Sequence, residues 1–350
     1  MSIVEINNLV KKYGDNVAVN DLSLNIDSKG VYGFLGPNGA GKSTTMNVLT
    51  GYIGATSGTV KINGYDIFKE PEEAKKNVGY LPEIPPLYQD MTVYEYLEFV
   101  SKIKKIKKEE RKACIEQSLE MTRTTEVSER LIRNLSKGYK QRVGIAQAIM
   151  GMPDLIILDE PTVGLDPKQI IEIRDLIRNL GKEHTVILSS HILTEISEVC
   201  ENIFIISQGK LVASGREEEL IEELAGENRI EAIIKGDANE IENILDKFGC
   251  KHSIETLDDE KCKAQIVTSR DIDIREGLFF ALAEKKMPLL ELKFKTKSLE
   301  DLFIELTTEY KAQPKKKGLK FKKKNSEKLD DRNLADNLKN EEKEVQEVEK

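Results

Sequence analysis

The stretch Gly36-Pro37-Asn38-Gly39-Ala40-Gly41-Lys42-Ser43-Thr44 follows the pattern G-x-x-x-x-G-K-[ST] without a gap. The apolar run before it, residues 31–35, is typical of a buried strand, and residues 44–49 are typical of the first turns of a helix. This strand–loop–helix context distinguishes a phosphate-binding loop from a chance match. The sequence therefore predicts an α/β protein organised around an anion-binding loop.

The residue types in this loop suit an anion that carries several phosphate groups. Gly36, Gly39 and Gly41 lack a Cβ atom, so the backbone can adopt positive φ and wrap closely around the anion. Successive amide N–H groups would face a phosphate at the positive end of the following helix. Lys42 adds a point charge, and the hydroxyl of Ser43 suits Mg²⁺. Taken alone, the loop has a second interpretation, a glycine-rich turn before a helix.

Two carboxylates follow a second buried strand. Residues 155–158 are apolar and lead into Asp159 and Glu160. Such a run is typical of a parallel strand, and ligands of open α/β sheets bind at the carboxyl ends of such strands. Asp166 and the following proline predict the start of a helix that ends near residue 181. Another buried strand, residues 185–188, leads into His191, and residues 203–207 and 210–213 predict a hairpin.

A helical insertion of about residues 84–152 separates the two motifs. Residues 82–90 contain three prolines and are expected to form a loop. Thr92 and Glu95 form a capping-box pattern that opens a helix to about residue 105, and a second helix is expected over residues 109–122. Ser136 can cap the helix that follows it, which makes another N-terminus suited to an anion.

The first 64 residues carry strand and turn patterns. Residues 3–9 predict a strand, residues 11–15 a turn, and the alternation up to residue 26 a half-buried antiparallel strand. Asn63-Gly64 is a hairpin pattern. Tyr13 precedes the second strand, where its ring could stack on a purine or could simply lie on the surface beside a turn. The residues leave both interpretations open.

Composition limits the class of protein. The chain has 350 residues, 39% of them hydrophobic, and no apolar run approaches the roughly 20 residues of a membrane-spanning helix. The N-terminus has no basic segment followed by an apolar core, so we expect no secretory signal and a cytoplasmic protein. The net charge of −8 argues against nucleic acid as a partner. The four cysteines are scattered without a CxxC, which favours reduced thiols.

The last third of the chain changes in pattern. Strands are expected at residues 229–234, 252–255, 264–267 and 289–294, with helices at 238–247 and 271–285. This β-α-β-β-α-β order predicts a small α+β accessory domain over residues 227–310 and is consistent with a ferredoxin-like architecture. Ser298 is expected to cap a last helix that ends near residue 310. Residues 311–350 form a block-charged tail, for which a solvated segment and a Lys-rich contact with anionic lipid are both open.

In these motifs the chain resembles the ATP-binding subunit of an ABC transporter, and more narrowly the separately encoded ATPases of bacterial ABC-2-type exporters. The resemblance covers about residues 2–220, and residues 298–303 resemble the family's C-terminal end. It implies an ABC ATP-binding domain over residues 1–222 that has a P-loop NTPase core. An antiparallel β subdomain, a helical subdomain and a small C-terminal α+β domain complete the expected architecture.

The resemblance also implies roles for single residues. The Walker A loop would bind ATP through Gly36, Pro37, Asn38, Gly39, Ala40, Gly41, Lys42, Ser43 and Thr44. Residues 155–159 resemble Walker B, in which Asp159 would hold Mg²⁺ together with Ser43. Glu160 would be the general base, His191 would contact the γ-phosphate, and Tyr13 would stack on adenine. Residues 164–166 resemble the D-loop, which includes Asp166.

Two motifs depart from the family pattern. Residues 135–139 resemble the signature LSGGQ, but Lys137 and Tyr139 replace Gly and Gln, while Ser136 and Gly138 are kept to contact the γ-phosphate. Glu83 stands where the family has a Gln facing Mg²⁺ and the attacking water. A glutamate keeps a metal-binding oxygen but adds a negative charge and removes the amide donor.

The resemblance implies a head-to-tail homodimer around two ATP molecules, joined to a separate membrane permease at the cytoplasmic face of the cell membrane. Three other classes share some of these motifs. An SMC-type repair ATPase needs long heptad coiled coils, and a ribosome-acting ABC protein needs two ATPase units in one chain; the sequence has neither pattern. A non-hydrolytic regulator would be expected to lack the base, which Glu160 supplies.

Overall fold

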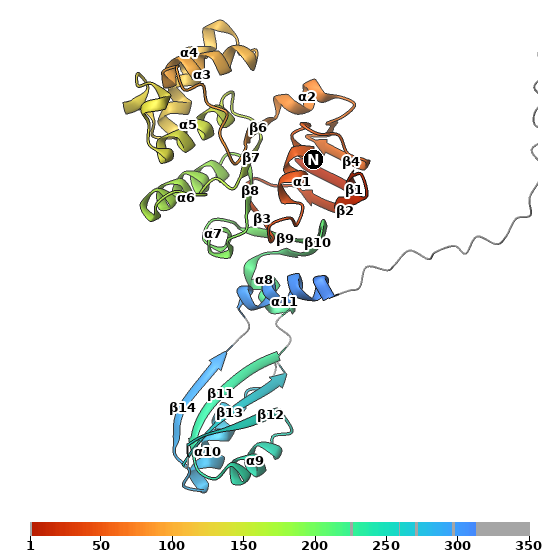
Figure 1. Ribbon diagram of the computed structural model, residues 1–350, viewed down its shortest axis with the longest axis vertical. Helices are drawn as coiled ribbons and strands as arrows, with labels where there is room; N and C mark the ends of the chain where they lie inside the picture. The colour runs from red at the N-terminus through yellow and green to blue at the C-terminus, as the bar shows by residue number, and fades with distance from the viewer. Residues whose placement is uncertain (1, 225–226, 259, 270–271, 296–297, 313–350) are drawn as a thin grey trace, which may run out of the picture. The chain divides into compact units, whose positions relative to one another are not determined.

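The computed structural model describes residues 2–224, 227–258, 260–269, 272–295 and 298–312 (Figure 1). Its centre is a six-stranded sheet with the strand order β10-β9-β3-β8-β7-β6. The strands are β3 (Gly30–Leu35), β6 (Val78–Leu81), β7 (Leu155–Asp159), β8 (Thr185–Ser190), β9 (Asn202–Ser207) and β10 (Lys210–Gly215). All neighbours pair in parallel except β9 and β10, which form the predicted hairpin.

Both faces of this sheet are buried because its strands alternate between two apolar clusters. Phe34 and Ile157 face one cluster, and Leu35 and Leu158, their neighbours in sequence, face the other. This two-residue period is the geometry of a pleated strand. The continuous apolar runs in the sequence therefore correspond to strands covered on both sides.

A second, antiparallel sheet has the order β2-β1-β4-β5 and covers one face together with α1 (Lys42–Leu49) (Figure 1). Its strands are β1 (Val4–Tyr13), β2 (Asn16–Ile26), β4 (Ser57–Ile62) and β5 (Tyr65–Asp66). The predicted turn over residues 11–15 is wrong in extent. Lys11 pairs with Val19 and Tyr13 with Asn16, so the ladder continues to a turn of two residues.

Helices α6 (Pro167–Gly181), α7 (Leu193–Ser197) and α8 (Glu217–Leu224) contribute to the opposite cluster. The predicted start of α6 is confirmed, because Asp166 Oδ1 accepts from the backbone N–H of Gln169 at 2.9 Å and proline is the first helical residue. Helix α2 (Pro71–Lys76) is short and lies before β6.

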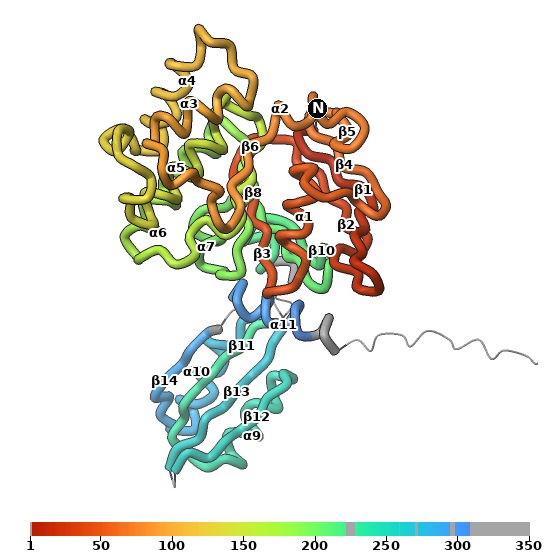
Figure 2. Tube along the Cα trace, turned by 45° about the horizontal axis from the view of Figure 1, so that its top comes forward, coloured from red at the N-terminus to blue at the C-terminus, as the bar shows by residue number. Residues whose placement is uncertain are grey.

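The insertion between β6 and β7 is helical, and Figure 2 shows it gathered apart from the strands of the antiparallel sheet. It contains α3 (Val93–Ile103), α4 (Lys108–Met121), α5 (Lys137–Ile149) and the 3₁₀ turns Thr125–Val127 and Ile132–Asn134. The capping box of Thr92 and Glu95 is confirmed by both of its hydrogen bonds. These helices pack around their own apolar cluster, which includes Leu97, Ile115 and Val143.

The C-terminal part is built from β11 (Glu227–Lys235), α9 (Ala238–Asp246), β12 (Lys251–Asp258), β13 (Lys261–Ser269), α10 (Arg275–Glu284) and β14 (Leu289–Lys295). Its antiparallel strands follow the order β12-β13-β11-β14, and its core includes Ile230 and Leu278. The predicted helix start, residue 271, lies outside the described residues, and residues 272–274 precede the helix. Asp273 Oδ1 accepts from the backbone N–H of Arg275, which places the first turn later.

The last helix, α11 (Leu299–Ala312), contributes Leu299 and Phe303 to the same cluster as α8. Ser298 Oγ accepts from the backbone N–H of Asp301 at 3.1 Å, which confirms the predicted cap. The domain boundaries at residues 222, 227 and 310 stay predictions. The predicted tail lies outside the described residues from residue 313 onward.

Candidate nucleotide site

The phosphate loop joins the end of β3 to the start of α1, and its shape depends on glycine. Gly39 and Gly41 have φ of 79° and 104°, a region that L side chains rarely adopt. A Cβ atom at Gly41 would lie 2.5 Å from the carbonyl oxygen of Ala18, and one at Gly36 would collide with the carbonyl oxygen of Ile206. Glycine is therefore needed at Gly36 and Gly41 for close backbone packing, and at Gly39 and Gly41 for the positive φ of the loop.

A turn distant in the sequence supports this loop. The backbone N–H of Gly209, between β9 and β10, donates to the carbonyl oxygen of Ala40 at 2.8 Å. The carbonyl oxygen of Gly209 accepts from the backbone N–H of Asn20 at 2.8 Å. Strand β2 and the β9–β10 turn therefore hold the loop from outside, a role that sequence reasoning did not assign to Gly209.

Lys42 begins α1 and is 5% exposed. Its ammonium group donates to the carbonyl oxygen of Gly36 at 2.8 Å and lies 3.6 Å from Oε1 of Glu160. Burial lowers the pKa of Lys42, while the charge of Glu160 acts in the opposite direction. The side chain thus places a cation between the loop and the end of β7.

Asp159 ends β7 beside the first turn of α1. Ser43 Oγ donates to its Oδ1 at 3.3 Å, and Ser189 Oγ donates to the same oxygen. The carboxylate is 4% exposed, so these hydroxyl groups satisfy a buried charge. Sequence reasoning gave Ser189 no role, because only the pairing of β7 with β8 brings it to Asp159.

Glu160 follows directly, with a positive φ of 48° and a side chain that is 9% exposed. Its backbone N–H donates to the carbonyl oxygen of Ser189 at 3.2 Å, which fixes this turn. Its Oε2 lies 2.9 Å from Nδ1 of His191. Glu160 is therefore held between Lys42 and His191, and the structure brings these three predicted residues together.

The donor set at the end of β7 fits Mg²⁺. A hydroxyl and a carboxylate are hard oxygen ligands, and Mg²⁺ usually takes only one or two protein carboxylates besides substrate phosphates and waters. Ser43 and Asp159 supply this minimum beside the phosphate loop. Among the described residues no group of three or more His, Cys, Asp or Glu side chains could hold a metal ion.

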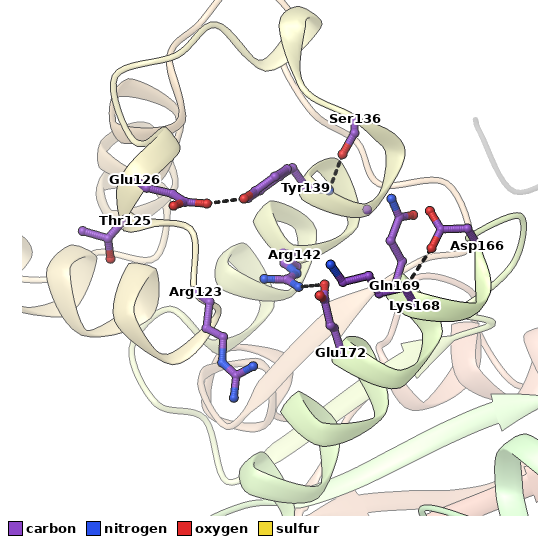
Figure 3. Close-up of a pocket in the computed structure, with 11 residues that line it drawn as sticks. Arg123, Thr125, Glu126, Ser136, Tyr139, Arg142, Asp166, Lys168, Gln169 and Glu172 are labelled. Atoms are coloured by element: carbon purple, nitrogen blue, oxygen red, sulfur yellow. Dashed lines mark hydrogen bonds and ion pairs between the residues drawn. The ribbon is translucent and has the colours of Figure 1, made fainter.

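The remaining site residues lie elsewhere in the chain. A hollow of about 630 Å³ is lined by Ser136, Gly138 and Asp166 together with residues of α5 and α6 (Figure 3). Ser136 Oγ accepts from the backbone N–H of Tyr139 at 3.3 Å, which confirms the predicted cap of α5. No residue of the phosphate loop lines this hollow, so in one chain the signature and Walker A residues are separate.

Tyr13 and Glu83 are both exposed. Tyr13 ends β1 at 50% exposure, with Nζ of Lys11 5.0 Å from its ring centroid. Glu83 lines a second hollow of about 240 Å³ together with Lys137 and Gln141. In the part of the chain that the structure describes, no hydrogen bond or ion pair joins Glu83 to Ser43 or Asp159.

A strand–glycine loop–helix cradle, a buried lysine and paired carboxylates at the carboxyl edge of a parallel sheet define a P-loop nucleoside triphosphatase. Comparison with known proteins gives the family. The model of the family described as "ABC transporter" matches residues 19–163. The chain belongs to the ABC transporter ATP-binding proteins, and it is an ATPase subunit of such a transporter.

Two relatives illustrate the extent of this likeness. The chain is 42% identical over 213 residues to the bacitracin transport ATP-binding protein BcrA of Bacillus licheniformis, which covers 60% of this chain and 69% of that protein. It is 32% identical over 306 residues to the linearmycin resistance ATP-binding protein LnrL of Bacillus subtilis (strain 168), which covers 87% of this chain and 98% of that protein.

Solved structures share the fold of the ATP-binding part. A structure titled "Structure of ATP binding subunit of ABC transporter" superposes with a TM-score of 0.58 and 29% identity, covering 63% of this chain and 92% of that one. A dimeric, post-hydrolysis structure of the ATP-binding cassette MJ0796 bound to ADP and Pi has a TM-score of 0.55 and 26% identity, covering 61% and 98%. Within the described ranges, no helix combines the length and apolar character that a membrane crossing requires.

Proposed function

We propose that this subunit hydrolyses ATP at a site formed by two copies of the chain and drives a separate, ABC-2-type export permease. The observation that carries the proposal is the convergence of Lys42, Ser43, Asp159, Glu160 and His191 at one end of the central sheet. These five side chains come from the phosphate loop, from β7 and the residue that follows it, and from the residue after β8. They supply a cation, the proposed ligands of Mg²⁺ and the proposed carboxylate base.

Phosphoryl transfer to water depends mainly on positioning and on neutralising charge. In our proposal the loop from Gly36 to Thr44 binds the phosphates through its N–H groups, and Lys42 supports their terminal charge. Glu160 accepts a proton from the attacking water, and His191 orients that carboxylate and contacts the γ-phosphate. Mg²⁺ held by Ser43 and Asp159, with Glu83 as a further contact, would neutralise charge on the phosphates. Tyr13 stacks on the adenine.

The proposal includes a second copy of the chain because one copy does not bring the signature and D-loop residues to its own phosphate loop. Ser136, Gly138 and Asp166 lie in a hollow of their own, and a head-to-tail partner would bring them to the nucleotide. The structure titled as a dimer with ADP and Pi supports such an arrangement in a related cassette. The names of relatives support export: bacitracin transport, linearmycin resistance, and, at 35% identity, the lipopolysaccharide export system of Haemophilus influenzae. The subunit would then sit peripherally on its permease at the cytoplasmic face.

Self-association around ATP tests this proposal. The purified chain with Mg²⁺ and a non-hydrolysable ATP analogue is expected to form a dimer, because the triphosphate joins the phosphate loop of one copy to Ser136 of the other. Light scattering after size-exclusion chromatography measures the mass. ADP serves as the control, since it lacks the γ-phosphate and should leave the chain a monomer. A monomer with both nucleotides would contradict the proposal.

Replacement of Glu83 by glutamine tests its contact with the metal. We expect Glu83→Gln to keep ATPase activity and to raise the Mg²⁺ concentration for half-maximal turnover by about two- to fivefold, because an exposed negative charge near the cation is lost. A titration of activity with Mg²⁺ at fixed ATP measures this shift. The matched control is Glu116→Gln on α4, another exposed glutamate. An identical Mg²⁺ dependence in Glu83→Gln and wild type would exclude the contact.

A further inference from the structure

The N-terminal half of α5 lies along the D-loop and the first turns of α6, and three contacts in register join them. Lys137 reaches Gly164, where an added Cβ atom would collide with its Nζ. At Gly138 an added Cβ atom would lie 2.7 Å from Cδ of Gln169. One turn further, Arg142 forms an ion pair with Glu172 (Figure 3). We call these contacts the α5–α6 seam.

The Arg142–Glu172 pair is the charged part of this seam. The side chain of Arg142 is 12% exposed and that of Glu172 is 33% exposed, so water screens the pair less than it screens ordinary surface pairs. Removal of one partner would leave a largely buried charge without its counter-ion, which is strongly unfavourable. Because either charge alone is unfavourable there, the pair ties the position of Arg142 on α5 to that of Glu172 on α6.

Tyr139 connects the seam to the rest of the helical insertion. Its hydroxyl donates to Oε1 of Glu126 in the 3₁₀ turn after α4, and its ring centroid lies 5.6 Å from Cζ of Arg142 (Figure 3). The hydrogen bond to Glu126 raises the pKa of Tyr139. The aromatic residue that replaces the family's glutamine thus bonds within its own chain and stacks on the guanidinium of the ion pair.

From this geometry we infer that Arg142 and Glu172 are positioning residues that fasten the signature turn to the D-loop. Ser136 and Asp166 would consequently meet the nucleotide on the second copy as one unit. The inference rests on the proposed dimer and adds a requirement to it. Neither residue of the pair touches the reacting groups; they act through Ser136, Gly138 and Asp166.

The role of the Arg142–Glu172 ion pair can be tested by removing one of its charges and by swapping the two charges. In Glu172→Gln we expect the protein concentration for half-maximal dimerisation with the ATP analogue to rise about tenfold, a normal size for coupling between contacting residues. Affinity of the monomer for ATP should stay within about twofold, because the phosphate loop is untouched. The charge-swapped variant Arg142→Glu/Glu172→Arg should recover most of the lost dimerisation, which a merely structural defect would not do.

Hydrogen–deuterium exchange gives a readout that does not need the dimer. In Glu172→Gln, the backbone amides of residues 135–139 and 162–166 should both exchange faster than in wild type. Their exchange should slow again in the charge-swapped variant. The matched control is Glu198→Gln, which breaks the ion pair of Glu198 with Arg174, also on α6, and should change neither exchange nor dimerisation.

Two results would overturn the inference. One is dimerisation and deuterium exchange in Glu172→Gln that equal those of wild type. The other is a charge-swapped variant that dimerises no more readily than Glu172→Gln. If the wild-type chain itself fails to dimerise, the proposed function fails instead, and the exchange measurement still decides whether the seam exists. If the charge-swapped variant does not fold, the comparison of Glu172→Gln with Glu198→Gln is sufficient to test the inference.

Discussion

Replacement of Glu160 by glutamine is expected to lower the ATPase rate by about 10²- to 10⁴-fold, the usual contribution of a positioned general base. Glutamine has nearly the same shape but cannot accept a proton from water at neutral pH. The backbone bond from residue 160 to the carbonyl oxygen of Ser189 does not depend on the side chain, so the turn should be preserved. ATP should still bind, and the bound dimer should accumulate because its hydrolysis is blocked.

Single-turnover measurement of phosphate release, together with the mass of the ATP-bound species, checks this result. The matched control is Glu195→Gln on α7, a 5% exposed glutamate that accepts from Ser190 Oγ at 2.8 Å. Glutamine can keep that hydrogen bond, so the control should turn over at nearly the wild-type rate. Hydrolysis by Glu160→Gln within about tenfold of wild type would remove Glu160 from the role of base.

Much of this architecture follows from local patterns, and local patterns have local physical causes. The caps at Thr92, Ser136 and Asp166 each satisfy a backbone N–H within three residues, so a short segment of sequence contains the whole interaction. The phosphate loop is predictable for the same reason, since its glycines and its lysine are adjacent. The continuous apolar runs indicated correctly the strands that are buried on both faces.

Contacts between distant segments were not predictable from the sequence. Ser189 meets Asp159 across 30 positions and Arg142 meets Glu172 across another 30, and nothing in either segment specifies its partner. Pairing also overrode composition in β1, where Lys11 and Tyr13 continue a ladder that polar residues had indicated to be a turn. The roles of Glu83 and Tyr13 rest on the resemblance, because both lie exposed and bond to no other predicted site residue in the described part of the chain.

Lys42→Ala is expected to weaken ATP binding by about 30-fold or more, the effect of removing one partner from a desolvated, hydrogen-bonded charge pair, about 2–5 kcal/mol. The ammonium group is the buried cation beside the phosphate loop, 3.6 Å from Glu160 and 2.8 Å from the carbonyl oxygen of Gly36. Without it, the negative charge of Glu160 would face the incoming phosphates with only His191 beside it. Repulsion would then add to the lost attraction.

A loss of ATP binding caused by unfolding of Lys42→Ala can be distinguished from a loss caused by the missing ammonium group. Burial disfavours the charged form of Lys42, as the direction of its pKa shift indicates, so its removal relieves one desolvation cost of the folded chain. Its removal also leaves the buried carboxylate of Glu160 with His191 beside it, so the two effects oppose each other. We therefore expect a small change in the unfolding temperature measured without nucleotide and a large decrease in the stabilisation that added ATP produces. Lys29→Ala, an exposed lysine just before β3, makes the same change in net charge and should bind ATP normally. Wild-type affinity in Lys42→Ala would mean that the triphosphate binds somewhere other than this loop, and the roles proposed for Ser43, Asp159 and Glu160 would fail with it.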